Sequence, residues 1–341
     1  MKLRLHTFEL QLSSPFRIAH GARTVQPTLV VELEGDGFTG YGEATATSYY
    51  GKDVNAMVYT LEELRPIIED SIIDTPEAFW QKMYPLLQDH PFELCALDVA
   101  AHDWHARRLK RPLYRHWGLD PATAPLTNYT IGIGPIEEMV AKIKEKPWPV
   151  YKVKLGTDHD LDIIKALRAE TSAKFRVDAN TAWTAEQTIA LAPALKELGV
   201  EFLEQPLKVT DREGMKAVFE HSVLPIIADE SCQLEADVET CQGHFHGINI
   251  KLMKCGGLTP ARRMIARARE LDLQLMVGCM TESTIGISAI AHLAPLLDYV
   301  DMDGALLLKS DIATGVTIEA GRAIYAQENG TGASLLPSVA T

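Results

Sequence analysis

The feature that most constrains this chain is a repeat of short β-rich runs, separated by helix-like stretches, between residues 126 and 303. Successive runs start 22 to 26 residues apart. They begin near Leu126, Tyr151, Phe175, Glu201, Pro225, Gly247, Leu273 and Tyr299. Eight strand-helix units at this period predict a closed (β/α)8 barrel. The alternative is a doubly wound open sheet, which is disfavoured because no GxGxxG turn follows the first run.

The residues before this repeat predict a separate capping domain. Leu3–Leu12 alternate between polar and apolar residues, and Asp36-Gly37 between two β-rich runs indicates a hairpin turn, because that turn needs positive φ. From about Asn55 to Arg111 the pattern becomes helical. The sequence therefore predicts an α/β protein in three parts. These are an N-terminal capping domain of hairpin strands and helices at 1–120, a TIM-type barrel at 121–315 and a C-terminal segment at 316–341 that returns to the cap.

Charge and composition exclude several classes of partner. The chain has 33 Lys and Arg against 46 Asp and Glu, a formal charge of −13, whereas nucleic acids and anionic membranes attract clustered positive charge. The five cysteines include no Cys-x-x-Cys pair, which favours a reducing compartment. The first residues do not resemble a signal peptide, and no apolar run approaches the roughly 18 residues of a membrane span. We expect a soluble cytoplasmic protein with a small-molecule substrate, and homo-oligomerisation stays open.

Charged residues occupy the ends of nearly all the predicted barrel strands, where the active site of such a barrel is assembled. Asp178, Glu204 and Asp229 come from three consecutive strands and are 26 and 25 residues apart, in register with the repeat. Three carboxylates without His or Cys form a hard-oxygen site, which favours Mg²⁺, with Mn²⁺ as a substitute, over Zn²⁺. Alternatively, each acid only caps a helix or lies solvated on a loop.

Three lysines complete the predicted chemistry. Lys152 and Lys154 are two residues apart, so both project from the same face of one strand, and we expect their mutual repulsion to favour proton loss from one of them. Lys251 lies four strands further round, on the opposite wall. Two bases facing each other across a metal-bound carboxylate would remove a proton from one face of a carbon and return one to the other. This arrangement predicts inversion at a carbon α to a carboxylate, through an enediolate.

These motifs resemble the enolase superfamily, and within it the muconate-lactonizing-enzyme subgroup, over almost the whole chain. The matching runs, in family order, are Lys152-Val153-Lys154, Asp178-Ala179-Asn180, Glu204-Gln205-Pro206, Ala228-Asp229-Glu230-Ser231 and Asn249-Ile250-Lys251. The resemblance implies that Asp178, Glu204 and Asp229 bind Mg²⁺. It also implies that Lys154 and Lys251 are the acid/base pair, and that Lys152 tunes Lys154 and helps to neutralise the substrate carboxylate.

Residues outside this machinery suggest the substrate. Asp301-Met302-Asp303 is similar to the Asp-x-Asp of dipeptide epimerases, which holds the α-ammonium group of a dipeptide; two same-face carboxylates form a cation site. Arg23 resembles an arginine that binds a glutamate side chain in some dipeptide epimerases, although a solvated loop arginine is the alternative. The resemblance thus implies L-Ala-D/L-Glu, a dipeptide of cell-wall turnover. Met280 and Glu282, beyond the seventh strand, are further candidates for substrate binding.

Other readings of the same residues stay open. An N-acylamino-acid racemase, an o-succinylbenzoate synthase or a cycloisomerase of the superfamily would use the same metal and lysines. A non-catalytic binding protein on this scaffold would be expected to have lost a metal ligand or a lysine, and none is lost in this sequence. One further expectation concerns Tyr49, Tyr50 and Gly51, which follow the hairpin and are placed to cover the barrel mouth.

Overall fold

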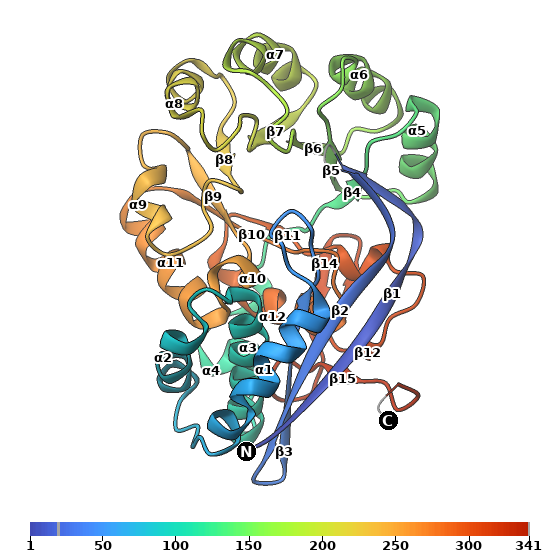
Figure 1. The fold of residues 1–341 in the computed structure, drawn as a ribbon. Helices are drawn as coiled ribbons and strands as arrows, with labels where there is room; N and C mark the ends of the chain where they lie inside the picture. Colours follow the sequence, from blue (N-terminus) through green and yellow to red (C-terminus); the bar gives the residue numbers. More distant parts are fainter. Residues whose placement is uncertain (19–20, 340–341) are drawn as a thin grey trace.

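The computed structural model describes residues 1–18 and 21–339, which form a barrel with a strand-rich domain against one side (Figure 1). The eight barrel strands are hydrogen-bonded in the order β11-β10-β9-β8-β7-β6-β5-β4, with parallel pairing throughout. A parallel bridge between Thr127 and Val300 joins the two ends of this sheet and closes the ring. The predicted (β/α)8 architecture is confirmed.

Most barrel strands begin within a residue or two of their predicted positions. The strands are β4 (Tyr129–Ile131), β5 (Val150–Lys154), β6 (Lys174–Asp178), β7 (Val200–Glu204), β8 (Ile226–Ala228), β9 (Gly247–Ile250), β10 (Gln274–Gly278) and β11 (Tyr299–Asp301). The helices around them are α5 (Ile136–Glu145), α6 (Asp160–Glu170), α7 (Ala185–Glu197), α8 (Arg212–His221), α9 (Asp237–Cys241), α10 (Leu252–Cys255), α11 (Leu258–Glu270) and α12 (Thr284–Leu293). The strands are buried on both faces, because side chains fill the barrel interior and helices cover its outside.

The N-terminal strands form a three-stranded antiparallel sheet of β1 (Lys2–Ile18), β2 (Gly21–Gly35) and β3 (Phe38–Thr45). The predicted hairpin is confirmed: Gly35 pairs with Phe38, and the turn residues Asp36 and Gly37 have φ of 50° and 77°. Four helices follow, α1 (Val54–Glu69), α2 (Pro76–Leu87), α3 (Pro91–Arg108) and α4 (Leu113–His116). The long β1–β2 ribbon reaches the barrel, where Ile133 N donates to the carbonyl of Arg17. The first domain therefore contributes to the barrel mouth.

Buried polar contacts connect this domain to the barrel and to the C-terminal residues. Glu43 on β3 accepts hydrogen bonds from the backbone N–H groups of Ser283 and Gly286 at the start of α12. Asp103 on α3 accepts a 2.7 Å hydrogen bond from Thr331 N. The last elements are short strands, β12 (Ala313–Thr314), β13 (Thr317–Glu319), β14 (Arg322–Ile324) and β15 (Ser334–Leu335). In the described part of the chain, no helix has the length and apolar character needed to cross a membrane.

Strand β3 lies directly on α3, and two glycines permit this approach. A Cβ atom on Gly42 would lie 2.1 Å from the carbonyl oxygen of Ala96, and one on Gly40 would lie 2.1 Å from that of Ala100. We expect Gly42→Ala to destabilise the protein by about 3 kcal/mol, because backbone rather than a flexible side chain must move. Urea unfolding measures this. Gly134→Ala is the control, since its nearest neighbour would be the Glu138 carboxylate at 3.7 Å; equal unfolding midpoints for the two variants would contradict the packing argument.

Candidate active site

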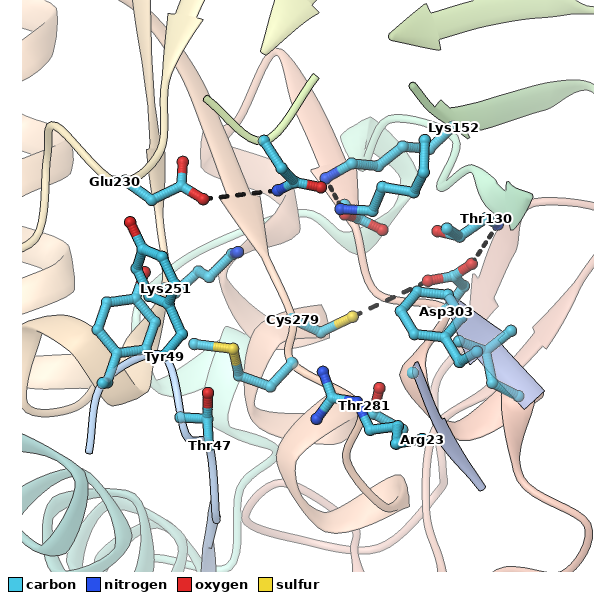
Figure 2. Close-up of a pocket in the computed structure, with 18 residues that line it drawn as sticks. Arg23, Thr47, Tyr49, Thr130, Lys152, Glu230, Lys251, Cys279, Thr281 and Asp303 are labelled. Carbon is cyan, nitrogen blue, oxygen red and sulfur yellow. Dashed lines mark hydrogen bonds and ion pairs between the residues drawn. The ribbon is translucent and has the colours of Figure 1, made fainter. Parts of the chain in front are cut away.

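The carboxyl ends of the barrel strands open into a cavity that the N-terminal domain covers in part (Figure 2). The barrel contributes its strand ends and the loop after β10. Phe16 and Arg23 enter from the β1–β2 ribbon, and Thr47, Tyr49 and Tyr50 enter from the loop after β3. The predicted position of the two tyrosines at the barrel mouth agrees with this lining. A substrate in the cavity is therefore enclosed by both domains.

Three carboxylates meet at the bottom of this region. Asp178 and Glu204 are register partners at the ends of β6 and β7, and Asp229 follows β8 directly. All three are buried, and one oxygen from each lies within 4.8 Å of the others. Burial and the negative charge of Asp178 raise the pKa of Glu204 to about 7. The sequence-predicted acids are thus brought together in a cluster where added positive charge is favourable.

The cluster fits a hard divalent cation. Glu204 Oε1 accepts a 2.8 Å hydrogen bond from Asn249, whereas Glu204 Oε2 is buried and has no hydrogen-bond partner among the described residues. This oxygen is 2.8 Å from Lys152 Nζ, within ion-pair range but outside hydrogen-bonding geometry. Mg²⁺ prefers carboxylate oxygens as ligands, and here such oxygens converge, one of them without a hydrogen-bond partner.

Sequence reasoning missed the residues that orient these acids. Lys254 on α10 is buried, and its ammonium group donates 2.6 Å hydrogen bonds to both the carbonyl oxygen and Oδ1 of Asp229. Gln205 Oε1 accepts hydrogen bonds from the backbone N–H groups of Asp229 and Ser231. The three-residue spacing from Lys251 to Lys254 could have indicated that Lys254 lies near the site; no comparable signal marks Gln205.

Lys152 and Lys154 point into the barrel from the same face of β5, as predicted. Lys154 Nζ lies 2.6 Å from Asp178 Oδ2, and Lys152 Nζ lies 3.1 Å from the same oxygen. Of this pair, Lys152 is the lysine that stays protonated. Burial lowers its pKa, but Asp301, Glu204 and Asp178 outweigh burial and hold the pKa well above the ordinary value. The acids surrounding this ammonium group dominate over the second lysine.

Lys251 occupies the opposite side of the cavity. It follows β9, which is four strands from β5 in the ring, and its Nζ lies 2.7 Å from Asp229 Oδ2. Burial lowers its pKa, but the Asp229 carboxylate outweighs burial and raises the pKa well above the ordinary value. Figure 2 shows Lys251 and Lys152 on opposite sides of the lined space. Amines on β5 and after β9 therefore face a bound molecule from two directions.

Asp301 and Asp303 also converge on the cavity, at the end of β11. Asp301 Oδ2 accepts a 2.9 Å hydrogen bond from Lys152 Nζ, and its Oδ1 accepts one of 2.7 Å from Asn128. Asp303 accepts a hydrogen bond from Thr130 N, and its Oδ1 is 3.9 Å from the Cys279 thiol. Asn128 was another residue missed from the sequence.

The remaining predicted substrate contacts divide into two groups. Arg23 and Met280 line the cavity, and the Arg23 guanidinium donates to Gln26 Oε1. Glu282 does not fit the expectation. Its carboxylate is buried and accepts a 2.8 Å hydrogen bond from Met280 N, so it closes its own loop instead of lining the cavity.

The fold and the site share the features of one class: barrel proteins whose strand-end carboxylates can hold a divalent cation and are flanked by lysines. Family models agree with this class. The mandelate racemase / muconate lactonizing enzyme N-terminal domain matches residues 2–118, and the enolase C-terminal domain-like model matches residues 136–339. The chain belongs to this mandelate racemase and muconate lactonizing enzyme family of the enolase superfamily.

Similar proteins and solved structures within this family include epimerases of dipeptides. The chain is 56% identical over 336 residues to the L-Ala-D/L-amino acid epimerase of Flavobacterium johnsoniae, covering 98% of this chain and all of that one. It is 34% identical to the L-Ala-D/L-Glu epimerase of Escherichia coli, covering 91% and 95% of the two chains. The substrate-liganded L-Ala-D/L-Glu epimerase from Bacillus subtilis superposes with a TM-score of 0.92 at 28% sequence identity, and the match covers 98% of this chain and all of that one. A dipeptide epimerase from Enterococcus faecalis, solved with Mg and the dipeptide L-Leu-L-Tyr, superposes with a TM-score of 0.90 at 31% sequence identity. This match covers 98% of this chain and 99% of that one.

Proposed function

We propose that the protein is a Mg²⁺-dependent dipeptide epimerase that inverts the α-carbon of the C-terminal residue of its substrate. The observation that carries this proposal is the position of two amines around one acid cluster: Lys154 pairs with Asp178, and Lys251 pairs with Asp229 from the opposite side. One amine removes the α-proton, and the other delivers a proton to the opposite face. The result is inversion, and no other group of the substrate changes.

The cofactor proposal depends on the donor set. Asp178, Glu204 and Asp229 would hold Mg²⁺, and Mn²⁺ shares the same preference for carboxylate oxygens. A bound divalent cation supplies positive charge where the substrate carboxylate gains negative charge as the α-proton leaves. Lys152, buried against Glu204 and Asp178, adds a fixed positive charge at the same place. Tyr49 and Tyr50 line the cavity and would limit water access to a bound substrate, which would strengthen each of these interactions.

We further propose dipeptides with an N-terminal L-Ala, L-Ala-D/L-Glu among them, as the substrate class. The relatives from Flavobacterium johnsoniae and Maribacter, 56% and 53% identical, are named L-Ala-D/L-amino acid epimerases, and Arg23 in the cavity wall suits an acidic second side chain. A cytoplasmic location is part of the proposal, supported by five cysteines that are all free. Homo-oligomerisation stays a prediction.

A substrate panel tests the proposal. We expect the purified protein with Mg²⁺ to epimerise L-Ala-L-amino acid dipeptides with a kcat/KM at least about 100-fold higher than for N-succinyl amino acids, because the latter have no ammonium group for the buried carboxylates at the end of β11 to bind. Chiral chromatography of the products measures the rate of epimerisation for both substrate classes. Faster turnover of the N-succinyl compounds would assign the protein to the racemases instead.

A further inference from the structure

The helix α10 begins directly after Lys251 and fixes the backbone of that lysine. Lys251 is the N-cap residue of this single turn, and its carbonyl oxygen accepts hydrogen bonds from the N–H groups of Lys254, at 2.9 Å, and Cys255, at 3.2 Å. All four residues of α10 are buried. The position of α10 therefore sets the point from which the Lys251 side chain reaches into the cavity.

The N-terminal domain holds the segment after Lys251 at two points. Trp80 on α2 donates a 2.9 Å hydrogen bond from Nε1 to the carbonyl oxygen of Gly256, which directly follows α10. Asp98 on α3 accepts hydrogen bonds from the backbone N–H and the hydroxyl group of Thr259, at 2.8 and 2.7 Å. The three side chains are buried, so breaking these hydrogen bonds would leave polar groups unpaired in the interior.

A further contact to α10 comes from the end of β3. The sulfur of Met253 accepts hydrogen bonds from the backbone N–H of Thr45, at 3.4 Å, and from its hydroxyl group, at 3.6 Å. Figure 1 shows α10 next to α3, against which it packs. Elements β3, α2 and α3 of the N-terminal domain thus hold one short segment of the barrel.

The opposing base, Lys154, is held differently. It is the last residue of β5, and the next residue, Leu155, donates a 2.9 Å hydrogen bond from its N–H to the carbonyl oxygen of Asp178 on β6. Asp160 at the start of α6 then accepts a 3.0 Å hydrogen bond from Gly156 N. These partners belong to the barrel itself. The segments that follow the two bases are therefore held by different parts of the molecule.

From this difference we infer that the N-terminal domain positions Lys251 through α10, with Trp80 and Asp98 as positioning residues for that base alone. The inference rests on the proposed function, since it takes Lys251 and Lys154 as the two bases. A displacement of about 1 Å in a reacting group can slow a chemical step about 100-fold. Loss of the Trp80 or the Asp98 contact should therefore slow proton removal by Lys251 and leave proton removal by Lys154 unchanged.

Proton exchange in variants with a single base separates the two lysines. Trp80→Phe keeps an aromatic ring on α2 but removes the Nε1–H donor, and it is introduced into both the Lys154→Ala and the Lys251→Ala protein. ¹H NMR in D₂O at saturating Mg²⁺ measures exchange of the dipeptide α-hydrogen. We expect exchange to become at least about tenfold slower in the Lys154→Ala protein, where Lys251 is the base. In the Lys251→Ala protein it should change by less than about twofold.

Trp104→Phe is the matched control, because Trp104 Nε1 donates a hydrogen bond of the same length, 2.9 Å, to the carbonyl oxygen of Gly35 on β2. We expect it to leave exchange unchanged in both single-base proteins. Asp98→Ala is the second variant for the positioning role and should behave like Trp80→Phe; if it does not fold, Trp80→Phe still decides. Equal slowing in both single-base proteins, or slowing in neither, would overturn the inference.

Backbone amide exchange provides a measurement that needs no substrate. By mass spectrometry, peptides covering residues 252–259 should exchange at least about tenfold faster in Trp80→Phe than in wild type or Trp104→Phe, because a local constraint is lost. Unchanged protection of these peptides in Trp80→Phe would also overturn the inference. Failure of the proposed function is distinguishable, because wild-type protein would then epimerise no dipeptide, whatever the protection of α10.

Discussion

Lys154→Ala and Lys251→Ala should each lower kcat for epimerisation by at least about 10³-fold, because each removes one of the two groups that move the α-proton. Both side chains line the cavity from opposite walls, and neither can replace the other across it. The measurement is the rate of product formation by chiral chromatography at saturating dipeptide.

Lys165→Ala is the matched control for this experiment. Lys165 lies on α6 and is exposed, with an ion pair to Asp162 that contributes little to stability. We expect wild-type kcat in this variant. The active-site variants should keep the wild-type circular dichroism spectrum and still bind Mg²⁺. Wild-type turnover by Lys154→Ala or Lys251→Ala would exclude the two-base scheme.

The second large effect concerns the acid cluster. Glu204→Gln should lower Mg²⁺ affinity by at least about 100-fold and abolish turnover at millimolar Mg²⁺, because it removes one of three charges at the centre of the donor set. Isothermal titration calorimetry measures the affinity without relying on activity. Chelation of wild-type protein with EDTA should have the same effect on turnover, and added Mg²⁺ should restore it.

Glu213→Gln controls for the loss of one carboxylate elsewhere in the barrel. Glu213 is exposed in the first turn of α8, away from the cavity lining. Mg²⁺ affinity and turnover should match wild type. If Glu204→Gln bound Mg²⁺ as tightly as Glu213→Gln, the cation would have to be held elsewhere.

The sequence predicts the barrel well, because its strands are buried on both faces and read as short apolar runs at a constant period. The same regularity places Asp178 beside Glu204, which are register partners in the structure. The two-residue period of a strand predicts correctly that Lys152 and Lys154 share one face. The start of β4 was the least accurate of the eight, since Leu126 precedes the observed start at Tyr129.

The parts that escaped prediction depend on contacts between distant segments. Asn128 and Asp301 are 173 residues apart, so no local pattern connects them. The acids around Lys152 could not be predicted for the same reason: its nearest charged neighbour in sequence is another lysine, whereas its neighbours in space are acids from three other strands. Glu282 illustrates the limit of strand-end reasoning, because a residue beyond a strand can turn back and bond its own loop.

Exchange of the substrate α-hydrogen in D₂O tests the opposed positions of Lys154 and Lys251 most directly. Each alanine variant retains one of the two bases, so each should still incorporate deuterium from one epimer of the dipeptide and not from the other. We expect the epimer exchanged by Lys154→Ala to be the one that Lys251→Ala leaves untouched, as followed by ¹H NMR. Exchange of the same epimer by both variants would place the two amines on one side, and exchange of both epimers by one variant would show that a single base reaches both faces of the α-carbon; either result would contradict the account.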